Sequence, residues 1–412
     1  MPFAPGCVFG RQTILQSNPT AGERRELRLM RTVLYTFFVS GAASQPLGSF
    51  IPYLQRSYGF SYDLSGVLLS CQSIGNLAAV LLTGILPIYL GRRRSILTTS
   101  VWMAVGYLVF ASGISAPLAL IVACLMTGIA RGGNSNFSNT MMSTLTEPRA
   151  TRGYNLSHGC FAIGALLSPL IMIFCTSRWP VYGWRITACG LMLLVATQIT
   201  VYARMDLPEI PEKKRGMGGV DRSFFRDKRF WLGGTMLFCY ISAEYAIMGW
   251  LVTYFTDTGV LALNQSQMMS SLLWLVIFCG RMVGAAVSGK IPARKLLLVD
   301  GFGFFACFLI VFNSRTPGMV IAGIIGVGLF MATIYTSAFS LGSAAIRGND
   351  FGSAAMNFTG SIGGVITPAL VGLVAERWGL QAGMGVVVLL TGLLLAAILV
   401  SVYVTREPAR TS

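Results

Sequence analysis

Acidic residues and histidine are scarce in this chain of 412 residues. Aspartate and glutamate together number 15 and His158 is the single histidine, against 31 lysines and arginines. One histidine excludes a histidine-rich metal site, and the sequence contains no phosphate-binding loop and no nucleophile motif. Eight of the nine cysteines lie in or at the ends of apolar stretches without the spacing of metal ligands. We therefore expect no enzyme activity, no cofactor and no metal.

Long apolar stretches dominate the sequence instead. Hydrophobic residues make up 54% of the chain and charged residues only 11%. Stretches of about 20 apolar residues recur, and each is long enough to cross roughly 30 Å of hydrocarbon. The sequence predicts an all-α membrane protein with twelve transmembrane helices. We expect them at residues 32–54, 63–88, 96–113, 116–140, 154–176, 184–204, 230–256, 265–288, 296–313, 317–341, 351–374 and 380–404.

Lysine and arginine crowd into every second connection between these stretches. With the amino terminus inside, 24 of the 31 basic residues fall on the inner side. Basic loops resist translocation, so this bias predicts a multi-pass protein of the cell (inner) membrane with both termini cytoplasmic. The net charge of +16 then reflects these loops beside an anionic leaflet and does not imply nucleic acid. The first 31 residues lack an apolar core, which argues against a cleaved signal peptide.

The chain divides into two similar halves. We expect an N-terminal segment at 1–31, six-helix bundles at 32–204 and 230–404, a cytoplasmic linker at 205–229 and a tail at 405–412. Residues 164–169 (GALLSP) match residues 363–368 (GGVITP) at an offset of 199, and a second set matches at an offset of 201. That set pairs Phe37, Ala42, Gly48 and Tyr53 with Phe238, Ala243, Gly249 and Tyr254. Duplicated parallel halves are typical of transporters that work by alternating access around a central cavity.

The loop after the second stretch carries a family motif. Residues 84–94 read GILPIYLGRRR and resemble the G-x-L-a-D-r-x-G-r-r loop of the major facilitator superfamily. The acidic position of that motif is Ile88 here and its first basic position is Tyr89, so the usual cytoplasmic latch between the halves is not expected. The resemblance implies the major facilitator fold. It also implies a cytoplasmic gating loop made of Gly84, Gly91, Arg92, Arg93 and Arg94.

Three further patches resemble the fucose, galactose and glucose proton symporter branch of that superfamily. They are residues 243–254, residues 274–281 and residues 155–169. The resemblance implies sugar transport by proton symport. In the sugar symporters, however, helices 1 and 4 each offer an acidic residue, whereas residues 44–49 (SQPLGS) and 131–136 (RGGNSN) contain none. The sugar specificity and proton site of the branch therefore do not carry over intact.

Ionisable side chains within predicted spans are the candidates for coupling. Glu244 lies near the middle of its span, and intramembrane ionisable residues are functional by default. Its alternative role is a structural ion pair with Arg281. His158 can exchange protons near neutral pH, or it can serve as a hydrogen-bonded packing residue. We expect Glu244, and His158 as second choice, to be the proton-coupling site.

Polar and aromatic side chains in other spans are the candidates for binding solute. Arg131 and Asn134 fall on one stripe of their helix, which we expect to face the cavity, although Arg131 could instead snorkel. Amides suit a polyhydroxy solute and also suit helix association, and large aromatic rings can stack on a sugar or fill the bundle. The predicted substrate-binding residues are Gln45, Gln72, Asn76, Arg131, Asn134, Trp250, Trp274 and Tyr335.

Three functions fit these features. The favoured one is a secondary transporter, a monomer in the bilayer, that moves a small polar, sugar-like solute together with protons. The second is an efflux antiporter for amphipathic compounds, but Pro169 is followed by Leu170 and Ile171 rather than by the Gly-Pro-x-x-Gly-Gly pattern of drug antiporters. The third is a non-transporting membrane receptor, which would need no central ionisable residues.

Overall fold

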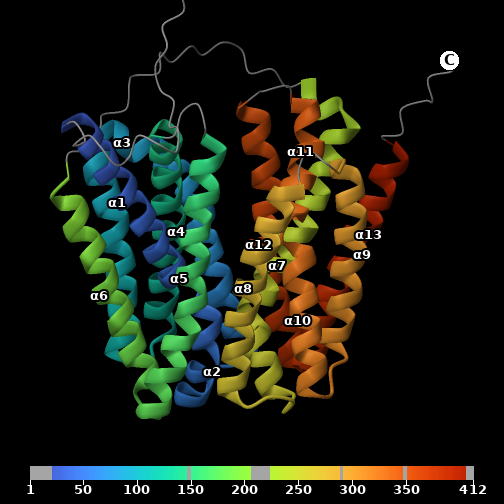
Figure 1. Cartoon of the computed structure of the whole chain (residues 1–412). Helices are drawn as coiled ribbons and strands as arrows, with labels where there is room; N and C mark the ends of the chain where they lie inside the picture. Colours follow the sequence, from blue (N-terminus) through green and yellow to red (C-terminus); the bar gives the residue numbers. More distant parts are fainter. Residues whose placement is uncertain (1–20, 146–149, 206–222, 288–290, 347–349, 405–412) are drawn as a thin grey trace, which may run out of the picture.

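The structure is a computed structural model that describes residues 21–145, 150–205, 223–287, 291–346 and 350–404. Most of the predicted linker, the whole predicted tail and much of the N-terminal segment lie outside these residues. The described residues fold into helices that form two bundles (Figure 1). The first bundle contains α1 (Ala21–Ser44), α2 (Leu47–Tyr58), α3 (Tyr62–Ser112), α4 (Pro117–Leu145), α5 (Ala150–Arg178) and α6 (Gly183–Ala203). The second follows the short helix η1 (Ser223–Arg226) and contains α7 (Lys228–Asp257), α8 (Leu263–Val287), α9 (Ala293–Phe312), α10 (Pro317–Met331), α11 (Ile334–Ile346), α12 (Asp350–Trp378) and α13 (Leu380–Val404).

Four of the predicted helices are interrupted or joined. The first pass breaks at Gln45 and Pro46, because proline has no N–H for the helical ladder and restricts the residue before it. The second and third passes are two helices, both within α3, that meet at a sharp kink at Gly91, where the backbone is not helical and the φ of 75° is accessible mainly to glycine. The tenth pass breaks between α10 and α11. With these adjustments the backbone makes the twelve expected passes in the described residues.

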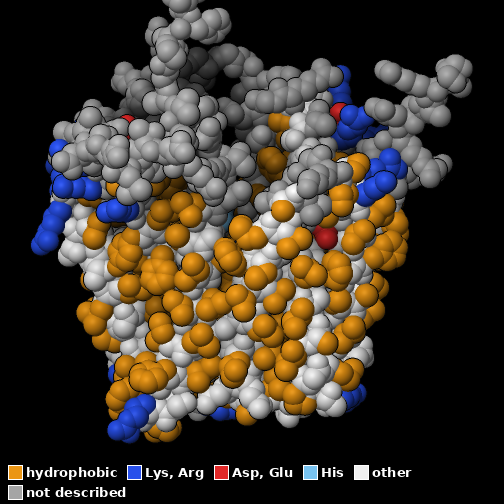
Figure 2. Space-filling view, in the orientation of Figure 1, with side chains coloured by type: hydrophobic (Ala, Val, Ile, Leu, Met, Phe, Trp, Pro, Cys, Tyr) orange, Lys and Arg blue, Asp and Glu red, His pale blue; other side chains and the backbone are white. Residues whose placement is uncertain are grey.

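Ten segments of the described chain are long and apolar enough to cross a membrane. The other two passes are α1 with α2, which is broken, and the first part of α3. That part of α3 carries Ser65, Ser70, Gln72 and Ser73, which are buried within the protein. These polar side chains therefore face other helices rather than lipid. Hydrophobic side chains cover the middle of the visible face, with lysine and arginine gathered toward the two ends (Figure 2).

The internal repeat is visible in the packing of helices. Gly164 of α5 packs so closely on α1 that an added Cβ would collide with the carbonyl group of Phe38. At the equivalent place in the second half, a Cβ on Gly363 of α12 would lie 2.6 Å from the carbonyl oxygen of Phe238 on α7. Small residues allow such close approach of membrane helices. The matching sequence segments thus make matching helix pairs.

The two halves meet at one end of the bundle. We call the end that bears the Gly91 kink the Arg92 end, and the opposite one, where α2 ends, the Gly59 end. Figure 1 shows the halves diverging toward the Arg92 end. Hydrogen bonds on the Gly59 side connect the halves between Tyr62 and Glu376, Ser70 and Ala369, Ser49 and Gln267, Ser177 and Asn264, and Leu166 and Ser271. These bonds hold the Gly59 end closed.

Candidate functional site

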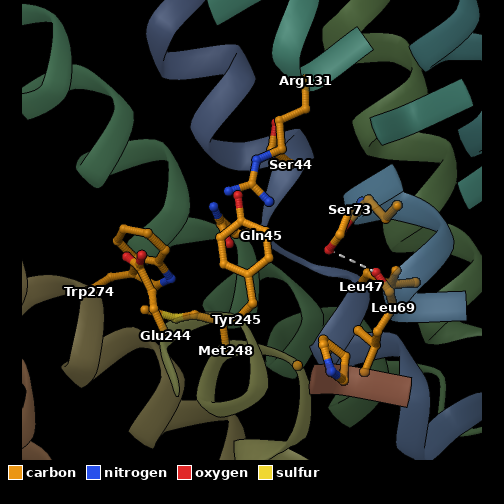
Figure 3. Close-up of a pocket in the computed structure, with 14 residues that line it drawn as sticks. Ser44, Gln45, Leu47, Leu69, Ser73, Arg131, Glu244, Tyr245, Met248 and Trp274 are labelled. Atoms are coloured by element: carbon orange, nitrogen blue, oxygen red, sulfur yellow. Dashed lines mark hydrogen bonds between the residues drawn. The ribbon is translucent and has the colours of Figure 1, made fainter. Parts of the chain in front are cut away.

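A central cavity of about 130 Å³ lies between the two halves. Both halves contribute to its wall, with α1, α2, α3 and α4 on one side and α7, α8 and α12 on the other (Figure 3). The side chains and backbone that line it belong to Ser44, Gln45, Leu47, Gly48, Leu69, Gln72, Ser73, Arg131, Glu244, Tyr245, Met248, Gly249, Trp274 and Pro368. The cavity therefore combines two opposite charges, several hydrogen-bonding groups and apolar surface.

The break in the first pass positions two polar groups of this wall. Ser44 ends α1 and Gln45 follows in the break, directly before Pro46. The Ser44 side chain is 1% exposed, and its hydroxyl has no hydrogen-bond partner in the structure. An unpaired buried hydroxyl costs free energy unless something else bonds to it. Its place in the cavity wall makes it available to a polar ligand.

Arg131 and Tyr245 face each other from opposite halves. The guanidinium carbon of Arg131 on α4 lies 5.2 Å from the centre of the Tyr245 ring on α7. Figure 3 shows the Arg131 side chain extending past Ser44 and Gln45 toward that ring. This cation–π contact holds the guanidinium in the cavity. The prediction placed Arg131 at the cavity, and the structure brings it there.

Glu244 enters the cavity from α7, next to Tyr245 in sequence. Figure 3 shows it beside Trp274 of α8. Its carboxylate lies within electrostatic range of Arg281 and Arg131 and in contact with the Tyr240 hydroxyl. Among these described side chains no salt bridge joins Glu244 to Arg281. The alternative role of Glu244, a direct ion pair with Arg281, is thus not formed among the described residues, although the two charges interact.

Gln45, Gln72 and Trp274 also line the cavity as expected. The Gln72 amide lies 3.4 Å from the Thr127 hydroxyl on α4, which orients it within the first half. The Trp274 ring packs edge-on against Phe161 of α5, with ring centres 5.9 Å apart. These three side chains come from the break in the first pass, from α3 and from α8. They supply amide and aromatic surface around the charged groups.

Two predicted binding residues on α3 and α4 lie away from the cavity. Asn134 is fully buried and accepts hydrogen bonds from Thr99 and Ser100, at 2.9 and 3.3 Å. The polar stripe of α4 thus faces α3 at Asn134 rather than the central space, because these hydroxyls provide partners inside the half. Asn76 packs against Gly132, where an added Cβ would lie 3.0 Å from its side-chain oxygen. Both amides therefore connect helices.

Two predicted aromatic binding residues are also engaged elsewhere. Trp250 is 0% exposed and donates a hydrogen bond of 3.1 Å to the carbonyl oxygen of Pro368. It lies below the cavity, toward the Gly59 end, and packs near Tyr62. The Tyr335 hydroxyl bonds the side-chain oxygen of Asn357, at 2.6 Å. Neither ring belongs to the cavity wall.

His158 on α5 lies outside the cavity wall as well. It is exposed, and its ring centre lies 6.0 Å from that of Phe37 on α1. Arg281 of the other half is within electrostatic range. His158 therefore lies between the halves, on the Arg92 side of the cavity.

The loop motif lies at the Arg92 end. Gly91 forms the kink described above, and Gly84 lies within α3. Arg93 donates a hydrogen bond to the carbonyl oxygen of Ala203, which ends α6. Arg92 is half-buried, Arg94 is exposed, and Tyr89 at the first basic position is 81% exposed. The motif thus connects α3 to α6 within one half.

Nine residues of the cavity wall were not predicted: Ser44, Leu47, Gly48, Leu69, Ser73, Tyr245, Met248, Gly249 and Pro368. Met248 lies one helical turn after Glu244, so a helical face drawn through Glu244 would have identified it. Ser73 follows Gln72 directly. Tyr245 and Ser44 had no distinguishing signal in the sequence.

Residues 33–368 match the sequence model of the Major Facilitator Superfamily. A curated relative, the protein TsgA of Escherichia coli O157:H7, is 24% identical over 278 residues, which cover 65% of this chain and 68% of TsgA. Solved structures with the same fold include a D-xylose-proton symporter, 13% identical, with a TM-score of 0.76 over 93% of this chain and 98% of that one.

Two further structures are similar. The nucleoside transporter NupG is 15% identical, with a TM-score of 0.71 over 92% of this chain and 100% of NupG. The E. coli fucose:proton symporter FucP is 17% identical, with a TM-score of 0.62 over 92% of this chain and 99% of FucP. The two-bundle fold and the match over most of the sequence agree: this chain belongs to the major facilitator superfamily of membrane transporters.

Proposed function

We propose that this protein is a secondary active transporter that moves a small polar solute across the membrane together with protons. The observation that carries the proposal is the central cavity, whose wall contains Arg131 from one half and Glu244 from the other. A site shared between two halves changes when the halves rock, as alternating access requires. Two proteins with the same fold are a D-xylose-proton symporter and a fucose:proton symporter, which supports the choice of the proton as the coupling ion.

The Arg92 end is the cytoplasmic end in this proposal, and the membrane is the cell (inner) membrane. The excess of basic residues in the loops on that side supports the orientation. The structure, with hydrogen bonds between the halves at the Gly59 end, then corresponds to an inward-facing state. One chain contains both halves and the whole cavity, so the transporting unit is a monomer.

Glu244 is the proton-coupling residue in this proposal. Intramembrane carboxylates that face a cavity serve as proton relays in transporters. Glu244 interacts electrostatically with Arg281 and Arg131 and is in contact with Tyr240. Adding or removing a proton at Glu244 would therefore change these interactions. A proton on Glu244 couples to solute only if both change the relative stability of the two facing states.

The experiment is solute counterflow with purified protein in liposomes. Liposomes are loaded with one unlabelled candidate each, from sugars, sugar acids, organic acids and amino acids, and uptake of the labelled compound is followed. Accumulation of a labelled solute that depends on the protein supports transport, and an imposed inward proton gradient should drive that solute uphill. Absence of counterflow for every class would refute the proposal.

A further inference from the structure

We infer that the transported solute is a small hydroxylated monocarboxylate, whose carboxylate pairs with Arg131. The inference rests on the proposed function and narrows its solute class. It departs from the neutral sugar that the sequence resemblance suggests.

The first argument is the balance of charge around Glu244. Two arginines, Arg131 in the cavity wall and Arg281 outside it, lie within electrostatic range of this single carboxylate. Asp300, a second buried carboxylate of the same half, accepts a hydrogen bond from Thr333 where α10 gives way to α11 and is not among the groups that act on Glu244. The described charged groups around Glu244 therefore carry one positive charge in excess. Charges in a membrane interior are costly unless they are paired, so a solute with one negative charge would stabilise this site.

The second argument is the place of the excess charge. Arg131 forms no salt bridge among the described residues and extends toward Ser44, Gln45 and Tyr245 (Figure 3). A guanidinium binds a carboxylate through two parallel N–H donors. The Ser44 hydroxyl, buried and without a partner, and the Gln45 amide add donors next to it. This part of the cavity is therefore suited to bind a carboxylate group.

The third argument concerns the wall that faces Arg131, which the second half forms, and the volume of the cavity. Glu244 accepts hydrogen bonds and therefore suits hydroxyl groups, while Trp274 and Met248 of the same half offer apolar surface to a short carbon chain. The cavity of about 130 Å³ is slightly smaller than the roughly 150 Å³ cavity that holds benzene. It therefore suits about six or seven non-hydrogen atoms, the size of glycerate. A zwitterion of that size would bring no net charge and would leave the excess uncompensated.

The test compares three compounds of nearly equal size: D-glycerate, glycerol and serine. They carry one negative charge, no charge and two opposite charges. Binding is measured by calorimetry on the purified full-length protein. We expect D-glycerate to bind at least tenfold more tightly than the other two. Arg131→Gln should remove this preference, whereas Arg94→Gln, at an exposed arginine of the Arg92 end, should retain it.

Two further variants test the charge balance itself. Glu244→Gln should strengthen glycerate binding severalfold, because it removes the one negative charge near the solute. Without ligand, Arg131→Gln should melt no lower than the parent protein, because it removes the unbalanced cation. A marked loss of stability in ligand-free Arg131→Gln would show that the arginine is already compensated and would overturn the inference.

The failure of this inference differs from the failure of the proposed function. If glycerol or serine binds as tightly as glycerate, or if Arg131→Gln keeps the preference for glycerate, the anionic solute class is wrong. The class is also wrong if none of the three compounds binds. The transporter proposal still holds in each case if any other solute shows counterflow.

Discussion

Gly48 and Gly249 occupy equivalent positions in the two halves and face each other across the interface. A Cβ built on Gly48 would lie 2.9 Å from the carbonyl oxygen of Gly249 and 3.1 Å from its Cα. These glycines are 201 residues apart, the offset of the internal repeat. The contact places α2 directly on α7 beneath the cavity. In the proposed alternating access, this contact is a point about which the halves would rock.

Replacing Gly48 by alanine should push the halves apart at the Gly59 end. Overpacking of this kind costs roughly 1–3 kcal/mol. That cost falls on the state described here, so the opposite facing state should gain about tenfold in population. Spin labels at Val181 and Gln381, one exposed position in each half near the Gly59 end, measure the change by double electron–electron resonance.

Gly190→Ala is the matched control for this variant. A Cβ there meets no atom within 4 Å, so the substitution should leave the label distances unchanged and stabilise α6 by up to about 1 kcal/mol. A Gly48→Ala protein with the distance distribution of the parent would exclude this contact as a constraint on rocking.

Glu376 connects the halves at the Gly59 end. Its carboxylate accepts a hydrogen bond of 2.8 Å from the backbone N–H of Tyr62, the first residue of α3. Negative charge at a helix N-terminus is favourable by roughly 0.3–1 kcal/mol when exposed. Glu376→Gln should therefore weaken closure of the Gly59 end, and the Val181 to Gln381 distance should lengthen in a few-fold larger fraction of molecules. The neighbouring Arg377→Gln should not change it; an equal effect in both variants would assign the shift to surface charge in general.

The arginines of the loop motif should affect conformation more than binding. Arg93 bonds the carbonyl group of Ala203, and none of the three loop arginines lines the cavity. Replacing Arg92, Arg93 and Arg94 together by glutamine should leave solute affinity in detergent within a few fold of the parent value. Calorimetry on the triple variant checks this. Complete loss of binding would place the loop in the binding site.

The passes across the membrane could be predicted because length and hydropathy of each stretch determine them. The break at Gln45 and Pro46 was missed because the hydropathy of the whole stretch 32–54 indicates only that it can span the membrane, not where its helix is interrupted. The cavity was predicted in part. Charged residues such as Arg131 and Glu244 stand out in apolar sequence, and they do line it. Asn134 could not be placed, because its orientation depends on hydroxyl partners in another helix.

Contacts between the halves were beyond prediction for a similar reason. They depend on which glycine backbone meets which, and glycine has no side chain that marks a face. The repeat identified Gly48 and Gly249 as equivalent positions. It did not show that they touch.

The most direct test of the central claim is uphill transport by Glu244→Gln in liposomes, with the solute identified by counterflow. We predict that this variant exchanges labelled solute across equal concentrations but does not accumulate it under an inward proton gradient. Asp300→Asn, which alters a buried carboxylate of the same half outside the cavity wall, should still accumulate solute. Accumulation by Glu244→Gln at the rate of the parent protein would contradict proton coupling through Glu244.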